Sequence, residues 1–450
     1  MKTPIPTNTA SFSLGEIAEA TGGTTATPNV VVRGVVIDSR QVATENLFVA
    51  LRGARRDGHE FVADVVARGA SAVLVETSAP GIPHVLVPDT EGALAALAAF
   101  HRRRFPGRVI AITGSAGKTS TKEMVAAAWS GIAEVVRTRG NMNNRIGTAL
   151  SVLQLHEKAS GGVFELGTNA PGEIAKLAAL TQPDVAIVTL IGSAHAAGLG
   201  DHAGIVQEKL SLLRALGERG VAIVRDEVAA LPAFREAVGA RRWLSFGSAG
   251  KLTFVRGPRG PQTQCRVRAG AAVVDLRLAS LGAGSALAAA AALAAAQLEE
   301  WGDIRHALEG VPPVPGRVCP VATPRLALLL DDAYNANPAS MRAGLETLVG
   351  LRRVYGGRAI AVLGEMAELG DLEAEAHAQV LRDAECLGVD RLVLCGSAFE
   401  RARSATSLPV VCTPDAASCL DALPELRRTD LVLVKGSRSA GLDVVVDALA

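Results

Sequence analysis

Residues 109–121 read Val-Ile-Ala-Ile-Thr-Gly-Ser-Ala-Gly-Lys-Thr-Ser-Thr, and this stretch decides the fold of the chain. Its β-branched, apolar start predicts a buried parallel strand, and residues 119–130 beyond the glycines predict a helix. Such a turn leaves free backbone N–H groups at the helix N-terminus, where phosphate oxygens bind. Only two residues separate Gly114 from Gly117, so the stretch is a shortened P-loop pattern; a plain turn with a surface lysine is the alternative.

Two side chains beyond these glycines suit a nucleoside triphosphate. Lys118 places a positive charge beside the β- and γ-phosphates, and the hydroxyl of Thr119 is a ligand for Mg²⁺. We therefore expect ATP as cofactor. The predicted phosphate-binding residues are Gly114, Ser115, Ala116, Gly117, Lys118, Thr119 and Ser120.

The composition of the whole chain excludes several function classes. Lys and Arg number 46 against 45 Asp and Glu, which argues against a general nucleic-acid binder, and 3% aromatic residues argue against base stacking. The N-terminus lacks the apolar segment of a secretory signal, and the apolar stretch 286–298 is too short to span a bilayer. The six cysteines form no CxxC pair, so we expect reduced thiols in a cytoplasmic protein without stable membrane insertion.

The order of predicted strands and helices indicates three α/β domains, as the length of 450 residues also suggests. We expect a small N-terminal α/β domain over residues 1–104, a central doubly wound P-loop sheet over 105–313 and a Rossmann-like C-terminal domain over 314–450. Phe105-Pro-Gly107 and the proline-rich run 311–317 mark the boundaries, because neither helix nor sheet tolerates them. Residues 221–279 are expected to form short strands.

Polar residues follow several predicted strands of the central domain. Glu165 ends the strand that begins at Gly162, and His195 lies in a glycine-rich loop beyond the strand 185–190. Ligands bind at the carboxyl ends of parallel strands, and an uncompensated Glu there would be costly, so a metal or cation partner is expected. An isolated His is more often structural, and Lys209, judged alone, is a surface lysine.

Two further polar stretches have structural and functional interpretations. Asn141, Asn143 and Asn144 lie in a segment that is either a solvated loop or a neutral hydrogen-bonding surface for a polar substrate. Asp38-Ser39-Arg40 follows a predicted strand, where it is either a turn or a contact for an anionic group.

Together these stretches resemble the Mur ligase family, in order over nearly the whole chain. The matching runs are residues 38–40, 48–51, 57–59, 113–119, 140–144 with 146–147, 165–169, 172–174, 315–317, 331–338, 363–370 and 434–438. The resemblance implies an ATP- and Mg²⁺-dependent amide ligase whose N-terminal domain binds a uridine nucleotide. The runs Tyr-Asn-Ala-Asn (334–337) and Met-Ala-Glu-Leu-Gly (366–370) point to the branch that joins D-alanyl-D-alanine to UDP-N-acetylmuramoyl-tripeptide through an acyl phosphate, in peptidoglycan precursor synthesis. A monomer is expected.

The resemblance also implies roles for individual residues. The implied catalytic residues are Lys118, Glu165, His195 and Lys209, and the implied metal ligands are Thr119, Glu165, His195 and Lys209, the lysine as a carbamate. The implied ATP contacts outside the P-loop are Arg317, Asp332, Asn335 and Asn337. The implied substrate contacts are Asp38, Ser39, Arg40, Asn141, Asn143, Asn144, Lys435 and Arg438, the last two near the incoming dipeptide and the acyl phosphate.

Three positions differ from the family pattern. Leu190 replaces an expected asparagine, Leu210-Ser211 replaces a Gly-Glu pair after Lys209, and Leu281-Gly282 replaces a His-Asn pair that bears on the adenine contacts. Two alternative functions are another amide ligase of the superfamily, such as a folylpolyglutamate synthase, and a nucleotide-dependent switch without ligase activity. In the switch, Glu165 would be dispensable.

Overall fold

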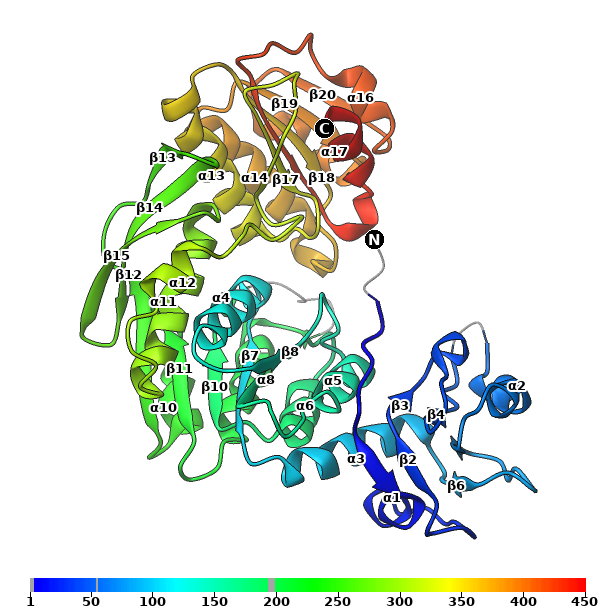
Figure 1. Cartoon of the computed structure of the whole chain (residues 1–450). Coiled ribbons are helices and arrows are strands. Elements are labelled where there is room, and N and C mark those ends of the chain that lie inside the picture. Colours follow the sequence, from blue (N-terminus) through cyan, green and yellow to red (C-terminus); the bar gives the residue numbers. More distant parts are fainter. Residues whose placement is uncertain (1–3, 54–55, 193–198) are drawn as a thin grey trace.

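The computed structural model describes residues 4–53, 56–192 and 199–450 as three α/β units in chain order (Figure 1). This three-domain α/β architecture confirms the predicted fold class. No helix in the described part of the chain is long and apolar enough to cross a membrane.

The N-terminal unit is a small parallel sheet with strand order β3-β4-β5-β6 and a separate antiparallel pair, β1-β2. Its elements are β1 (Ser11–Ser13), α1 (Leu14–Thr21), β2 (Val31–Arg33), β3 (Val35–Val36), β4 (Leu47–Val49), α2 (Val62–Ala67), β5 (Ala72–Val75), β6 (His84–Leu86) and α3 (Thr90–Arg104). Helix α1 begins with a capping box in which Ser13 and Glu16 satisfy each other's backbone N–H. Helix α3 packs against both α1 and the central unit, so one hydrophobic core runs through the two units.

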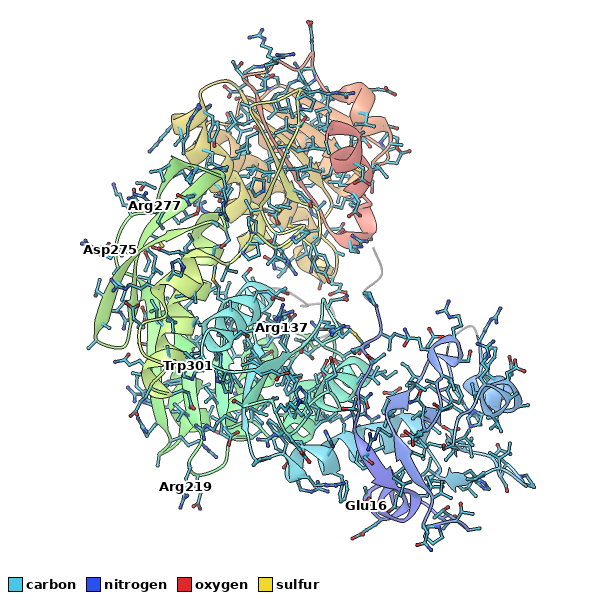
Figure 2. All side chains as sticks on the ribbon, in the orientation of Figure 1. Glu16, Arg137, Arg219, Asp275, Arg277 and Trp301 are labelled. Carbon is cyan, nitrogen blue, oxygen red and sulfur yellow. The ribbon has the colours of Figure 1, made fainter. Side chains whose placement is uncertain are left out.

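The central unit is built on a nine-stranded sheet of order β13-β14-β12-β11-β10-β7-β9-β8, with β15 paired to β14. Its strands are β7 (Arg108–Thr113), β8 (Val135–Arg137), β9 (Gly161–Glu165), β10 (Val185–Val188), β11 (Val221–Arg225), β12 (Arg242–Ser248), β13 (Thr253–Gly257), β14 (Gly260–Ala269) and β15 (Ala272–Leu278). Strands β7 to β12 run parallel to their neighbours within the group, and β13 to β15 add an antiparallel extension. Figure 2 shows Asp275 and Arg277 pointing outward from that extension.

Helices cover both faces of the central sheet. They are α4 (Lys118–Ser130), α5 (Arg145–Val152), α6 (Glu173–Thr181), α8 (His202–Arg214), α9 (Asp226–Ala229), α10 (Pro232–Val238), α11 (Gly282–Leu298) and α12 (Arg305–Glu309). The alanine-rich α11 packs closely on α4, since its small side chains allow a near approach. Beyond α11, Trp301, which is labelled in Figure 2, stacks on Trp129 of α4 with ring centroids 5.1 Å apart.

The expectation of strands alone over residues 221–279 was wrong, because α9 and α10 lie within this range. Asp226 and Glu227 in the first turn of α9 favour its N-terminus, and Pro232 occupies the first turn of α10, where its fixed φ is compatible with a helix.

The C-terminal unit is a six-stranded sheet of order β16-β17-β21-β18-β19-β20, parallel except for β16. Its elements are β16 (Cys319–Val321), β17 (Leu328–Asp332), α13 (Pro338–Tyr355), β18 (Ala359–Gly364), α14 (Glu373–Leu387), β19 (Arg391–Cys395), α15 (Ser397–Ala402), β20 (Val410–Thr413), α16 (Ser418–Ala422), β21 (Leu431–Lys435) and α17 (Asp443–Leu449). The extension of the central sheet reaches this unit where β13 and α11 pack against α13 (Figure 1).

Candidate active site

The turn between β7 and α4 has the backbone conformation that close approach of a phosphate requires. Gly114 and Gly117 have φ values of 151° and 82°, and a Cβ on Gly114 would lie 2.0 Å from Thr189 Oγ1. Helix α4 begins at Lys118, so the N–H groups of its first turn face the turn. Lys118 Nζ donates to the carbonyl oxygen of Gly114 at 2.8 Å, which holds the ammonium over the loop.

Glu165 lies directly behind this loop, at the end of β9 and in register with Ile112 of β7. Its side chain is 2% exposed. Oε2 accepts from the Thr119 hydroxyl at 2.9 Å, and Oε1 accepts from Asn143 Nδ2 at 2.7 Å. A hydroxyl and a carboxylate oxygen therefore meet where a P-loop helix begins.

This donor set fits Mg²⁺, which prefers oxygen ligands and is usually held by one or two carboxylates together with substrate phosphates. Within the described ranges, no group of three or more His, Cys, Asp or Glu side chains could hold a metal by itself. A Mg²⁺ ion held by Thr119, Glu165 and the phosphates of a nucleotide agrees with this donor set, and it needs no cluster of three protein ligands. His195, the other predicted imidazole ligand, lies outside the described residues.

The interpretation of Lys209 as a surface lysine was wrong, because its side chain in α8 is fully buried. Its Nζ has no hydrogen-bond partner among the residues that the structure describes. Burial, with the nearby charge of Lys118, lowers the pKa of Lys209 to about 7, although Glu208 and Glu173 oppose the shift. A neutral, unpartnered amine at this position is the form that can accept CO₂ to become a carbamate.

The neighbouring Glu208 holds the loop that follows β9. Its carboxylate accepts from the hydroxyl of Thr168 at 3.2 Å and from the backbone N–H groups of Gly172 and Ile174 at 2.7 Å each. Glu208 of α8 therefore fixes this loop, and the next residue of the helix, Lys209, contributes the buried amine.

The three asparagines of the 141–144 segment have different surroundings. Asn143 donates to Glu165, and Asn144 caps α5 by accepting from Gly147 N at 2.9 Å. Asn141 lines the large cleft between the central and C-terminal units. Asn143 thus orients the carboxylate of Glu165 and Asn144 fixes the start of α5, besides any contact with substrate, and Asn141 hydrogen-bonds with the side chain of Tyr334.

The C-terminal unit supplies the opposite wall of this cleft, which has a volume of about 1800 Å³. The guanidinium of Arg317 lies 4.3 Å from the ring centroid of Tyr334. Asn337 caps α13, and its Nδ2 donates across the cleft to the carbonyl oxygen of Ser115 at 3.5 Å. Arg438 lines the same wall and pairs with Asp443 at 2.9 Å.

At the base of this wall the buried side chains of Asp332 and Lys435 meet the backbone of the exposed Asn335. Lys435 Nζ lies 2.7 Å from Asp332 Oδ2 and donates to the carbonyl oxygen of Asn335 at 3.0 Å. The structure therefore brings the predicted ATP contacts 317, 332, 335 and 337 to the cleft that holds the P-loop.

The Asp38-Ser39-Arg40 turn lies in the N-terminal unit and does not line this cleft. Arg40 donates to Asp38 through its backbone N–H and its guanidinium, and these bonds hold the pKa of Asp38 below its ordinary value. The turn is therefore well ordered by its own side chains.

Sequence reasoning did not consider Thr189, and it used Tyr334 only as part of the run 334–337, with no role of its own in the site. Thr189 follows β10, and its hydroxyl donates to the carbonyl oxygen of Ala116 at 2.6 Å, which fixes the P-loop from below. Thr189 directly follows β10 and Tyr334 lies two residues beyond the end of β17, and this position after parallel strands is the signal that could have identified them.

Comparisons with known proteins match this arrangement. Three family models match the chain: the Mur ligase family catalytic domain over residues 31–139, the Mur ligase middle domain over 112–296, and the Mur ligase glutamate ligase domain over 316–438. The UDP-N-acetylmuramoyl-tripeptide–D-alanyl-D-alanine ligase of Escherichia coli K12 is 34% identical over 448 residues, with 98% of each chain covered. The ligase of the same name from Bacillus subtilis 168 is 32% identical, with 96% of this chain and 97% of the relative covered.

Solved structures are similar over the same length. A crystal structure of MurF from Acinetobacter baumannii superposes with a TM-score of 0.89 at 31% identity and covers 98% of this chain and 99% of its own. MurF from Thermotoga maritima in complex with ADP has a TM-score of 0.82 at 27% identity, with 92% and 96% covered.

Proposed function

This chain belongs to the Mur ligase family, and on that premise we propose that it joins D-alanyl-D-alanine to UDP-N-acetylmuramoyl-tripeptide at the expense of ATP, in peptidoglycan precursor synthesis. The observation that carries the proposal is the cleft in which the P-loop faces Arg317 and the 331–338 loop of the C-terminal unit. Full-length relatives at 32–35% identity carry the name of this ligase.

ATP binding follows from the geometry of the two walls. The N–H groups at the start of α4 and the ammonium of Lys118 suit the β- and γ-phosphates. Arg317 adds a second positive charge from the opposite wall, and its stacking on Tyr334 limits where the guanidinium can lie. ATP and a substrate carboxylate repel each other, so cations on both sides are needed where they meet.

Thr119 and Glu165 would hold Mg²⁺, and we propose His195 and a carbamylated Lys209 as further ligands. When bound, the metal neutralises phosphate charge and polarises the phosphoryl group. Asn143 keeps the carboxylate of Glu165 oriented by donating to its second oxygen.

A cleft between two walls that can approach each other suits an acyl phosphate, which water would hydrolyse. Asn337 bridges to Ser115 and so joins the two walls beside the P-loop. Closure of this kind excludes water while the amine of the dipeptide attacks. We place the nucleotide part of the tripeptide substrate at Asp38, Ser39 and Arg40, and the dipeptide carboxylate near Arg438.

The other two functions considered from the sequence are less well supported. Similarity to a folylpolyglutamate synthase structure is 18% identity at a TM-score of 0.55, which indicates a shared fold alone. A switch without ligase activity disagrees with full-length relatives that are ligases. We further propose a cytoplasmic monomer with domains over residues 1–104, 105–313 and 314–450, to be tested by light scattering and limited proteolysis.

Phosphate release and product mass test the function directly. With ATP and Mg²⁺, phosphate should appear only when both UDP-N-acetylmuramoyl-tripeptide and D-alanyl-D-alanine are present, and the product mass should be that of the pentapeptide. Tripeptides with diaminopimelate or lysine at the third position are assayed separately. Equal phosphate release after omission of either substrate would refute the proposal.

A further inference from the structure

A buried ion pair lies beneath the ATP-facing loop of the C-terminal unit. Asp332 ends β17 and Lys435 ends β21, and the two residues are in register on neighbouring strands. Their charged atoms are 2.7 Å apart, and the side chains are 7% and 1% exposed. Lys435 also donates to the carbonyl oxygen of Asn335, so its ammonium is engaged by the protein's own groups.

The second oxygen of Asp332 reaches the segment that carries Arg317. Asp332 Oδ1 accepts from the backbone N–H of Val318 at 3.3 Å, and Asp331 Oδ2 accepts from that of Gly316 at 2.9 Å. Neighbouring carboxylates thus hold the chain on both sides of Arg317.

The backbone around Arg317 needs such support. Val318 has a φ of 51°, which is rare for a β-branched residue, and Gly316 has a φ of 73°. Unfavourable backbone conformations of this kind persist only where surrounding contacts enforce them, and they cluster at functional sites.

A buried charge pair adds little net stability to a fold, because desolvation of the charges offsets their attraction. Burial lowers the pKa of Lys435 and raises that of Asp332, and the attraction between the two opposes both shifts. Well-packed apolar residues in place of such a pair are often neutral or stabilising, so the pair is better explained by the groups that it positions.

We propose that Lys435 is a positioning residue for the ligase reaction: it holds Asp332 and the carbonyl of Asn335, and through Asp332 and Val318 it sets Arg317 in the cleft. It therefore acts on ATP through Arg317 and does not contact the dipeptide or the acyl phosphate. This inference rests on the proposed function and goes beyond it in assigning Lys435 an indirect role.

A double-mutant cycle tests the route through Arg317. We expect Lys435→Met and Arg317→Ala each to lower kcat/KM for ATP by about tenfold or more, and the double variant to stay within about threefold of Arg317→Ala, because residues that act as one unit are not additive. Losses that multiply in the double variant would overturn the proposal, since they indicate an independent contact of Lys435.

Calorimetric titration with a non-hydrolysable ATP analogue repeats the cycle without turnover. The same non-additivity is expected in the Kd. A wild-type protein that binds the analogue but makes no pentapeptide would refute the proposed function, and the titration would still decide the role of Lys435.

A second variant separates the loss of positioning of Arg317 from the loss of stability. In Asp332→Leu/Lys435→Met the charges are removed together, so we expect Tm to return close to that of the wild type while kcat/KM for ATP stays low. Recovery of activity along with Tm would overturn the positioning role.

Asp430 provides the matched control. It is a fully buried carboxylate that pairs with Arg358 at 2.6 Å in the same unit, just before β21 begins. Asp430→Asn should lower Tm, as Lys435→Met does, and leave kcat/KM of the folded protein unchanged. An equal loss of kcat/KM in both variants would overturn the assignment, because it would trace the effect to general destabilisation.

Discussion

Gly316 and Gly22 have similar positive φ values and different neighbours. Their φ values are 73° and 68°, but a Cβ on Gly316 would lie 2.8 Å from Tyr334 Cβ, whereas one on Gly22, which ends α1 in the left-handed conformation, would meet nothing within 4 Å. Gly22→Ala should therefore lower the free energy of unfolding by about 1 kcal/mol, the ordinary cost of a left-handed alanine, and leave activity unchanged. Gly316→Ala should cost more and also lower kcat/KM for ATP, because it displaces Tyr334 beneath Arg317.

Urea unfolding and steady-state kinetics measure the two glycine variants. Equal stability losses with unchanged activity in both would contradict the contact between Gly316 and Tyr334 as a determinant of the site.

Glu165 is a second residue with a testable role, because the negative charge of its carboxylate should determine kcat. Glu165→Gln keeps the size of the side chain and removes the negative charge that faces Thr119. If Glu165 is a metal ligand, kcat should fall by about a hundredfold or more, because a metal supplies several kcal/mol of charge stabilisation. Nucleotide binding without Mg²⁺, measured by calorimetry, should remain.

Glu123→Gln is the control for this variant. Glu123 lies on the same P-loop helix, where it pairs with Lys122 and Arg137, and its loss should leave kcat within about twofold, because its side chain does not line the cleft. Full activity of Glu165→Gln would favour a role in structure alone.

Single residues differ in how far the sequence alone could place them. The conformation of the P-loop turn could be predicted from local rules, because it follows from the spacing of Gly114, Gly117 and Lys118. The burial of Lys209 could not be predicted in this way, because it depends on how α8 packs. The sequence pattern of an amphipathic helix with one inward-facing lysine does not differ from that of other amphipathic helices.

Among the elements, helix α8 carries a testable pH dependence. Because burial lowers the pKa of Lys209 to about 7, the unfolded chain binds a proton that the folded chain lacks between about pH 7 and 10.4. Stability of the wild type should therefore rise with pH through this window. Lys209→Met removes this linkage and should be more stable by about 2–4 kcal/mol near pH 7.5, with the difference lost near pH 10.5.

Denaturant unfolding in CO₂-free buffer at several pH values measures this difference. Lys158→Met, at an exposed lysine, should show little change at any pH. Activity of Lys209→Met should be lost if the lysine is a metal ligand. A stability gain that does not vary with pH would contradict a neutral buried amine.

The elements themselves were predictable where the local pattern is strong. Apolar runs predicted β7, β9 and β10 to within a residue or two, since strands of a parallel sheet are buried on both faces. The antiparallel strands β13 to β15 were expected only as short strands. Their docking on α13 depends on contacts between distant segments, which no local pattern encodes.

At the scale of the whole molecule, the C-terminal unit is attached at two unlike places. Near the P-loop, Asn337 donates a long hydrogen bond to Ser115, and the side chain of Tyr334 hydrogen-bonds with Asn141. At the far side, Phe254 of β13 packs against Gly350 of α13, and Arg256 stacks on Tyr355 with 4.4 Å to the ring centroid. We expect the polar contacts near the P-loop to break easily, and the packing at the far side to be the joint about which the unit turns.

Phe254→Ala tests this joint. A Cβ on Gly350 would lie 2.4 Å from the Phe254 ring, so the ring fills the space that the glycine leaves, and its loss should free the C-terminal unit. We expect a larger radius of gyration in small-angle X-ray scattering and a severalfold lower kcat, because Arg317 would meet the P-loop less often. Val255→Ala, on the opposite face of the same strand, should leave both unchanged. If Phe254→Ala scatters and turns over as the wild type does, the geometry of the cleft is set at the linker 311–317 and not at this joint.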